Sequence, residues 1–222
     1  MSLIKVSPSL LQGRAPQLAS ITDTLVNKGF AIIPGFLTLD ESRDLAAECL
    51  NLREQGEFHR AGVGRGEMLE VRPEIRSDEI RWLARNDCGP LQAEYIDLMA
   101  SYRQTLNREL FLGLVEFECF CAVYPPGSFY QRHIDQFRGV EQRTITAITY
   151  LNENWRESNG GQLRIFLNEQ TQETLEVLPE AGTFVTFLSA DYWHEVLPAE
   201  RDRLSITGWF KTRPIGEVFP LQ

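Results

Sequence analysis

The residues with the clearest chemical potential are a histidine and an aspartate two positions apart. His133 and Asp135 stand in the run QRHID, and the chain has only three histidines. Because residues i and i+2 of a β-strand point to the same side, both side chains would project together. An imidazole beside a carboxylate can form a hydrogen-bonded pair, an acid–base pair or two-thirds of a metal site.

A second histidine extends this pair to a set of three. His194 lies in the run DYWHEVLPA, late in the chain. Two histidines and one carboxylate are typical of Fe(II) sites that bind the metal on one side and leave the other open. No thiolate accompanies them to favour zinc. By itself an HxD pair is weak evidence, because such pairs also occur as satisfied polar pairs on surfaces and in cores.

An arginine nine residues after His194 strengthens the interpretation. Arg203 stands in RDRLSITGWF, where apolar and polar residues alternate. Arg203 and Thr207 therefore share one face of the predicted strand, opposite an apolar face. A guanidinium that faces a barrel interior needs an anion, and a carboxylate is its preferred partner. We expect Arg203 to anchor a cofactor that carries a carboxylate.

The elements that would position these residues change character along the chain. Helical spacing predicts a helix that ends at Gly29 and a second that begins at Thr38, with Glu41 completing a capping box, and ends at Gly56. The longest predicted helix covers residues 91–110. Short runs rich in β-branched and aromatic residues follow, separated by turn formers, as in an antiparallel barrel or jelly roll. We expect helices packed outside a β core.

Composition limits the partners and the compartment. The net charge of −9 argues against nucleic acid or an anionic membrane as a partner. The cysteines lack zinc-site spacing, and Cys119 and Cys121 are expected to be small hydrophobes on a shared strand face. The N-terminus lacks the apolar core of a signal peptide, and no apolar run approaches the ~20 residues of a membrane span. We expect a cytoplasmic protein.

Several motifs together resemble one enzyme family. The runs YPPGSFYQRHIDQF, RTITAITYLNENW, NGGQLRIF, WHEV and RLSITGWF are similar, in order and spacing, to the Fe(II)- and 2-oxoglutarate-dependent dioxygenases of the prolyl 4-hydroxylase superfamily. The likeness is strongest to the animal hypoxia-inducible-factor prolyl hydroxylases. It includes the upstream runs NKGFAIIPGFL and EIRSDEIRWL and covers about residues 18–212.

The resemblance implies a fold and a set of roles. The fold would be mainly β with flanking helices: a single domain over residues 1–222, with a double-stranded β-helix (jelly roll) at about 114–212 packed against a helical part at about 16–110. The iron ligands would be His133, Asp135 and His194. Arg203 and Tyr150 would hold the distal carboxylate of 2-oxoglutarate, with Tyr124 near its keto-acid end and Thr207 beside the arginine. Both tyrosines are also compatible with ordinary aromatic strand packing.

The upstream likeness implies a mobile substrate loop with Arg76, Asp78 and Trp82. Glycines in residues 62–74 would make this segment permissive enough to serve as a lid. Arg76 and Asp78 would hold a closed conformation by pairing with each other or with nearby charges. Ser77 replaces the usual glycine of the family, which leaves the loop's flexibility and substrate preference open. His59 matches no motif and is expected on the surface.

The implied activity is hydroxylation of a prolyl residue in an intracellular protein, with a translation or transcription factor as one candidate. The reaction would consume Fe(II)-activated O2 and convert 2-oxoglutarate to succinate and CO2, with ascorbate as an optional reductant. A monomer is expected. Two alternatives stay open: hydroxylation of free proline or another small molecule, and a non-catalytic jelly-roll binding protein with a vestigial site.

Overall fold

Three helices begin and end where local sequence signals place them. The computed structural model describes residues 10, 12–64, 70–136, 141–168 and 170–214. Helix α1 (Ala15–Lys28) ends at Gly29, which has the left-handed φ of 76° that glycine adopts without strain. Helix α2 (Leu39–Glu54) begins after Thr38, whose hydroxyl accepts from the Glu41 amide while the Glu41 side chain accepts from the Thr38 amide. Helix α3 covers Pro90–Leu110.

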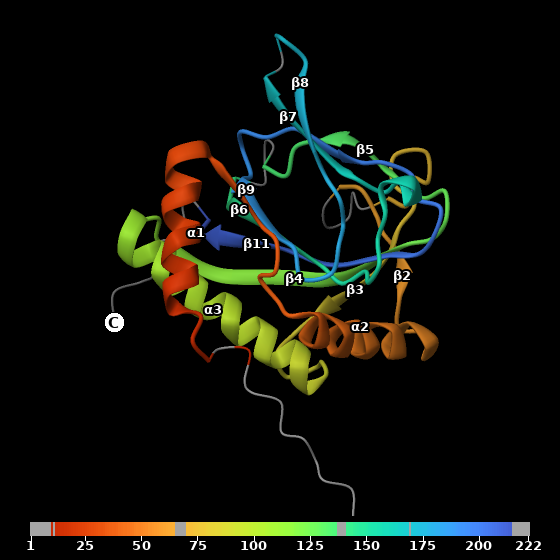
Figure 1. Cartoon of the computed structure of the whole chain (residues 1–222), viewed down its shortest axis with the longest axis horizontal. Coiled ribbons are helices and arrows are strands. Elements are labelled where there is room, and N and C mark those ends of the chain that lie inside the picture. The colour runs from red at the N-terminus through yellow and green to blue at the C-terminus, as the bar shows by residue number, and fades with distance from the viewer. Residues whose placement is uncertain (1–9, 11, 65–69, 137–140, 169, 215–222) are drawn as a thin grey trace, which may run out of the picture.

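The strands form two antiparallel sheets that face each other (Figure 1). The larger sheet has the order β1-β9-β6-β11-β4-β3-β2, with bounds Phe30–Ile33, Phe184–Leu188, Arg143–Tyr150, Arg203–Thr212, Leu114–Tyr124, Glu79–Leu83 and His59–Arg60. The smaller has the order β5-β10-β7-β8, with bounds Tyr130–His133, His194–Val196, Leu163–Asn168 and Glu173–Val177. The expected mainly-β jelly roll with flanking helices is confirmed. Strands β1 to β3, from the part expected to be mainly helical, extend both edges of the larger sheet.

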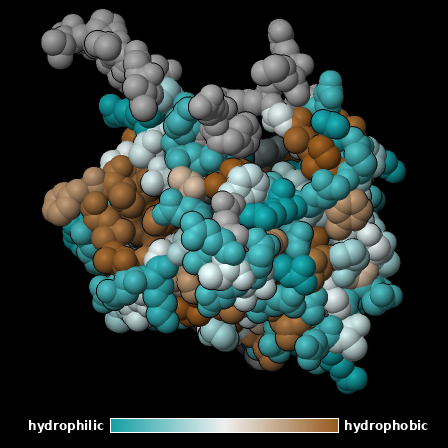
Figure 2. Space-filling view, turned by 90° about the horizontal axis from the view of Figure 1, so that it is seen from above, coloured by the Kyte–Doolittle hydropathy of each residue, from teal (hydrophilic) through white to brown (hydrophobic). Residues whose placement is uncertain are grey.

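The surface mixes hydrophilic and hydrophobic side chains. Figure 2 shows hydrophilic residues over much of the face seen from above, with a hydrophobic area at its left. The large hydrophobic side chains exposed in the described part of the chain are Val26, Leu39, Leu50, Val71, Trp82, Phe111 and Val115. None of the described helices combines the length and apolar character that a membrane crossing requires.

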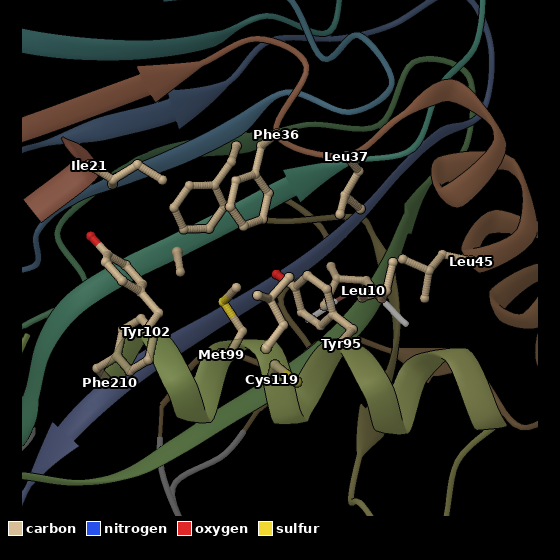
Figure 3. Packing of buried hydrophobic residues seen from close by; sticks show 14 of the residues in the cluster. Leu10, Ile21, Phe36, Leu37, Leu45, Tyr95, Met99, Tyr102, Cys119 and Phe210 are labelled. Carbon is tan, nitrogen blue, oxygen red and sulfur yellow. The ribbon is translucent and has the colours of Figure 1, made fainter. Parts of the chain in front are cut away.

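One hydrophobic cluster lies between the helices and the outer face of the larger sheet. Helix α3 contributes Tyr95, Met99 and Tyr102, and Figure 3 shows them facing Phe36 and Leu37 from the segment before α2. Burial of these large side chains supplies most of the stabilisation that holds helices to a sheet. The helices therefore cover the larger sheet on the side away from its smaller partner.

The second cluster lies between the two sheets, and strand alternation separates it from the first. On β4, Cys119 and Cys121 face the helices, whereas Phe120 and Tyr124 face the smaller sheet. On β11, Leu204, Ile206 and Phe210 belong to the helix side. Three residues on the opposite face of β11 line a cavity between the sheets: Arg203, Thr207 and Trp209. The predicted face of Arg203 and Thr207 is confirmed.

The cysteines differ from expectation in one respect. Cys119 and Cys121 share a buried strand face as predicted, but Cys121 forms a disulfide with Cys49 of α2. The Cα atoms of this pair lie 6.3 Å apart, and 72 positions separate them in the sequence. Such a contact is set by how α2 packs on β4, so cysteine spacing gave no indication of it.

Candidate active site

The three predicted metal ligands meet at the edge of the smaller sheet. His133 ends β5 and His194 begins β10, and the two are direct cross-strand partners. Asp135 follows two residues after His133, and its carboxylate oxygens lie 3.7 Å from Nε2 of His133 and 3.6 Å from Nε2 of His194. The three donor atoms all lie within 4.8 Å of one another. Donor atoms at this separation can bind the same metal ion.

Backbone hydrogen bonds orient both imidazoles for metal binding. Nδ1 of His133 lies 2.8 Å from the Gln131 carbonyl oxygen, and Nδ1 of His194 lies 3.1 Å from the Tyr192 carbonyl oxygen. A carbonyl oxygen only accepts, so each Nδ1 carries the proton and donates. Each Nε2 then presents a lone pair toward Asp135, which is the tautomer of metal-binding histidines.

The protonation states also suit a cation. Burial, together with the nearby His194, lowers the pKa of His133 to about 3, and Asp135 only partly opposes this effect. Burial alone would raise the pKa of Asp135, but the two histidines and the Thr146 hydroxyl outweigh it, so this pKa is lowered. A neutral His133 imidazole and a carboxylate are therefore available near neutral pH, and they fit Fe(II).

Side chains around the ligands restrict their movement. The Thr146 hydroxyl donates to Oδ2 of Asp135 over 2.7 Å, and the edge of Phe187 packs on His194 with ring centroids 4.9 Å apart. The ring of Tyr130 stacks on His133 at 3.6 Å and 14°. Residues i and i+3 of a regular strand point to opposite faces, but the β5–β10 register shifts in this interval, as at a β-bulge.

Arg203 lies between the sheets as a carboxylate anchor would. The residue is 2% exposed, and its guanidinium makes one well-aligned hydrogen bond to the described residues, from Nε to the Gly161 carbonyl oxygen over 2.8 Å. No carboxylate of those residues pairs with it. A buried guanidinium with its terminal nitrogens uncompensated is costly, so this arrangement suits a bound anion.

The two predicted tyrosines flank this guanidinium. The Cζ atom of Arg203 lies 4.9 Å from the Tyr150 ring centroid and 5.1 Å from that of Tyr124. The Tyr150 hydroxyl is buried and has no hydrogen-bond partner among the described residues. A buried hydroxyl without a partner is unfavourable, so a ligand carboxylate there would satisfy both groups. Thr207 lines the same cavity, of about 80 Å³.

The upstream residues reach the site through a buried ion pair. Nε and Nη2 of Arg76 donate to the two carboxylate oxygens of Asp78 over 2.8 and 2.6 Å, and Asp78 is fully buried. Burial would lower the pKa of Arg76, but Asp78 outweighs it and the pKa is raised. The Arg76 guanidinium also lies over the Tyr130 ring, with Cζ 4.4 Å from the ring centroid. Arg76 therefore supports the ring that supports His133.

Hydrogen bonds join the same upstream segment to the strand that carries His133. The Ser77 amide donates to the Phe129 carbonyl, and the Phe129 amide donates to the Ser77 hydroxyl, both over 3.1 Å. The Gln131 amide donates to the Ile75 carbonyl over 2.8 Å. Glycine at position 77 would lack the side-chain contact, so the serine ties this segment more firmly to β5.

Trp82 and the expected lid lie further from the metal ligands. Trp82 is 43% exposed and packs edge-on against Phe120 at 5.0 Å. It lines a groove that adjoins the cavity of the metal ligands, as does exposed His59. Residues 65–69, in the centre of the expected lid, lie outside the described residues.

Sequence reasoning missed several side chains that complete the site: Tyr130, Arg143, Thr146 and Trp209. Strand periodicity held a usable signal for two of them. Thr146 lies four positions before Tyr150 on β6, and Trp209 lies six after Arg203 on β11, so both fall on inward faces. Arg143 offered no such signal.

Known proteins share this fold. The family described as the 2OG-Fe(II) oxygenase superfamily matches residues 119–211. The structure of a Pseudomonas putida prolyl-4-hydroxylase is 43% identical, with a TM-score of 0.79 over 89% of this chain and 100% of that one. A Trichoplax adhaerens prolyl hydroxylase, solved with a hypoxia-inducible-factor peptide fragment, is 28% identical with a TM-score of 0.81, over 93% and 94% of the two chains.

Curated proteins of similar sequence include hypoxia-inducible-factor prolyl hydroxylases. The hypoxia-inducible factor prolyl hydroxylase of Caenorhabditis elegans is 30% identical over 198 residues, which are 82% of this chain and 26% of that protein. Human Egl nine homolog 1 is 29% identical over 87% of this chain and 46% of its own length. The chain thus spans a quarter to a half of the length of these relatives.

The fold and the His-Asp-His donor set fit the 2OG-Fe(II) oxygenase superfamily. The chain belongs to the 2OG-Fe(II) oxygenase superfamily and, within it, to the prolyl hydroxylase family. The expected cofactors Fe(II), 2-oxoglutarate and O2 are those of this family.

Proposed function

We propose that the chain hydroxylates a prolyl residue in a cytoplasmic protein and converts 2-oxoglutarate to succinate and CO2 in the same reaction. The observation that carries this proposal is that a set of metal ligands and an unpaired guanidinium line the same cavity. Nε2 atoms of two histidines face one carboxylate, and the uncompensated Arg203 guanidinium lies in the same cavity.

Each group has a defined part in this reaction. His133, Asp135 and His194 would hold the iron, which with 2-oxoglutarate and O2 supplies the oxidising chemistry when bound. Arg203 and the Tyr150 hydroxyl would fix the carboxylate at the other end of the cavity. Burial of these groups excludes water, which strengthens their electrostatic contacts and limits side reactions.

Two features favour a polypeptide substrate over free proline. The cavity opens beside a groove of about 590 Å³, and the two share Arg76, Phe120, Tyr130, Arg143 and Trp209 as lining residues. Free proline would occupy little of such a groove. The related Trichoplax enzyme was solved with a peptide fragment. Identity of the target, a monomeric state, a role for ascorbate and the absence of nucleic-acid or membrane partners stay predictions.

Mass spectrometry of a host proteome tests the proposal. The proteome is incubated with the enzyme, Fe(II), 2-oxoglutarate and O2, and searched for proline that gains ~16 Da, the mass of one oxygen atom. The matched control is Asp135→Ala, which should bind no iron. We expect prolyl hydroxylation with wild type alone.

The alternatives give different results in the same experiment. Hydroxylation of free proline as fast as any protein site would favour a small-molecule hydroxylase. Absence of succinate formation in the presence of iron would favour a non-catalytic binding protein. Either result would overturn the proposed protein substrate.

A further inference from the structure

The groove beside the metal site carries positive charge in a chain whose net charge is −9. Its described lining includes four cationic side chains and one carboxylate: Arg60, Arg76, Arg143, Lys211 and Glu118. Apolar residues, Val63, Ile80 and Trp82 among them, form part of the same wall. A groove of opposite sign to the rest of the molecule attracts an acidic partner.

The existing ion pairs leave part of this charge unbalanced. Arg76 is neutralised by buried Asp78. Glu118 is shared, because Nε of Arg143 lies 3.0 Å and Nζ of Lys211 lies 2.9 Å from its carboxylate. Lys211 also contacts Glu116 over 3.2 Å, but that carboxylate is 56% exposed and is screened by solvent.

Arg60 is the cation with the least compensation. It is exposed on strand β2, and no hydrogen bond or ion pair joins its side chain to the described residues. Its cross-strand neighbour is Glu79, but the Glu79 carboxylate is bonded to Arg53 over 2.8 Å. Arg60 is therefore available to a ligand in the groove.

Arg143 lies where the groove meets the metal site. Its guanidinium stacks over the Trp209 ring with Cζ 3.5 Å from the centroid, and it lines both the groove and the cavity of the metal ligands. Stacking and the bond to Glu118 hold the guanidinium in place, which lowers the entropy lost when it binds an anion.

We propose that the substrate of this site is a proline flanked by acidic residues, with its carboxylates held along the groove by Arg60, Lys211 and Arg143. The inference rests on the proposed prolyl hydroxylation and names the substrate class. The apolar wall would receive the non-charged side chains of the same segment.

Three synthetic peptides with one proline test the charge preference. They differ only in the residues flanking the proline, which are glutamates, glutamines or lysines. Hydroxylation is followed by mass spectrometry, and kcat/KM is compared at low and high salt. Wild type should prefer glutamate over glutamine and glutamine over lysine, and the preference should shrink with salt.

Arg60→Glu provides the decisive variant, because Arg60 makes no contact that the fold needs. The change should lower kcat/KM for the glutamate peptide roughly 3- to 20-fold, as expected when an exposed pair becomes a repulsion. It should raise kcat/KM for the lysine peptide and leave substrate-free turnover of 2-oxoglutarate unchanged. Arg108→Glu on α3, on the helix-covered side of the larger sheet, alters net charge equally and should leave the peptide order unchanged.

The outcomes separate the inference from the function on which it rests. Equal kcat/KM for the three peptides, or the same effect from Arg108→Glu as from Arg60→Glu, would overturn the acidic preference and leave prolyl hydroxylation standing. Succinate formation without prolyl hydroxylation in either the peptides or the proteome would overturn the prolyl function itself. A reversed peptide order in Arg60→Glu alone would support the proposal.

Discussion

Removing one partner of the buried Arg76–Asp78 pair should destabilise the protein strongly. The Asp78 side chain is fully buried, Arg76 is 9% exposed, and two hydrogen bonds of 2.8 and 2.6 Å join them. Asp78→Leu leaves a guanidinium buried without a counter-ion, which costs ~3–5 kcal/mol. Arg76→Met leaves the carboxylate alone at a similar cost. The double variant leaves no buried charge and should cost far less than the sum.

Urea denaturation of the metal-free protein measures these effects. The four proteins form a double-mutant cycle, and an unchanged m-value shows that the denatured state is the same. The matched control is the Arg72–Glu74 pair, which has the same spacing and a 2.9 Å contact but side chains 49% and 61% exposed. Removing this exposed pair should lower the free energy of unfolding by no more than ~1 kcal/mol.

A second readout tests the link from Arg76 to the metal. Because Arg76 lies against Tyr130 and Tyr130 lies against His133, Asp78→Leu should weaken Mn(II) binding while the protein remains folded. Additive single variants, or losses as small as those of the exposed pair, would refute the electrostatic reasoning. Unchanged Mn(II) affinity in a folded Asp78→Leu variant would refute the positioning of His133 through Tyr130.

Three further predictions concern the cofactor and metal sites. Arg203→Lys should weaken 2-oxoglutarate binding roughly 10- to 150-fold by calorimetry, because an ammonium cannot reproduce the guanidinium fork; unchanged affinity would mean that another group holds the carboxylate. Gly161→Ala should lower the free energy of unfolding by ~1–2 kcal/mol in urea denaturation, because Gly161 has φ +70°. It should also weaken 2-oxoglutarate binding, because the added Cβ would lie 3.2 Å from Cδ of Arg203. His133→Ala and Asp135→Ala should remain folded but lose the rise in melting temperature that Fe(II) gives wild type under anaerobic conditions; an equal rise in either variant would contradict the assigned ligand set.

Features set by local periodicity were predictable from the sequence. The i, i+2 spacing of His133 and Asp135 predicted that their side chains lie together, which is confirmed, although β5 ends at His133 and Asp135 lies just beyond the strand. The alternation after Arg203 placed the guanidinium inside. Thr38 and Gly29 bounded helices because capping depends on a few adjacent residues. The functional roles of the site residues were inferred from family motifs and stay predictions.

Features set by contacts between distant elements were not predictable in this way. The Cys49–Cys121 disulfide depends on the packing of α2 on β4. The addition of β1 and β3 to opposite edges of the larger sheet depends on which strand each pairs with. Sequence spacing carries no information on either pairing, since many registers satisfy the same alternation.

The stacking of Tyr130 on His133 shows how a strand irregularity can assemble a metal site. In an unbroken β5 these residues would face opposite sides, because they are three positions apart. Val196 pairs with Tyr130 and His194 with His133, so two steps along β10 correspond to three along β5. The extra residue brings the Tyr130 ring against the His133 imidazole, and the Arg76 guanidinium also lies over this ring. Restoring regular pairing by deleting one residue between them should therefore move Tyr130 away from the imidazole and lower metal affinity, even with all three ligands present.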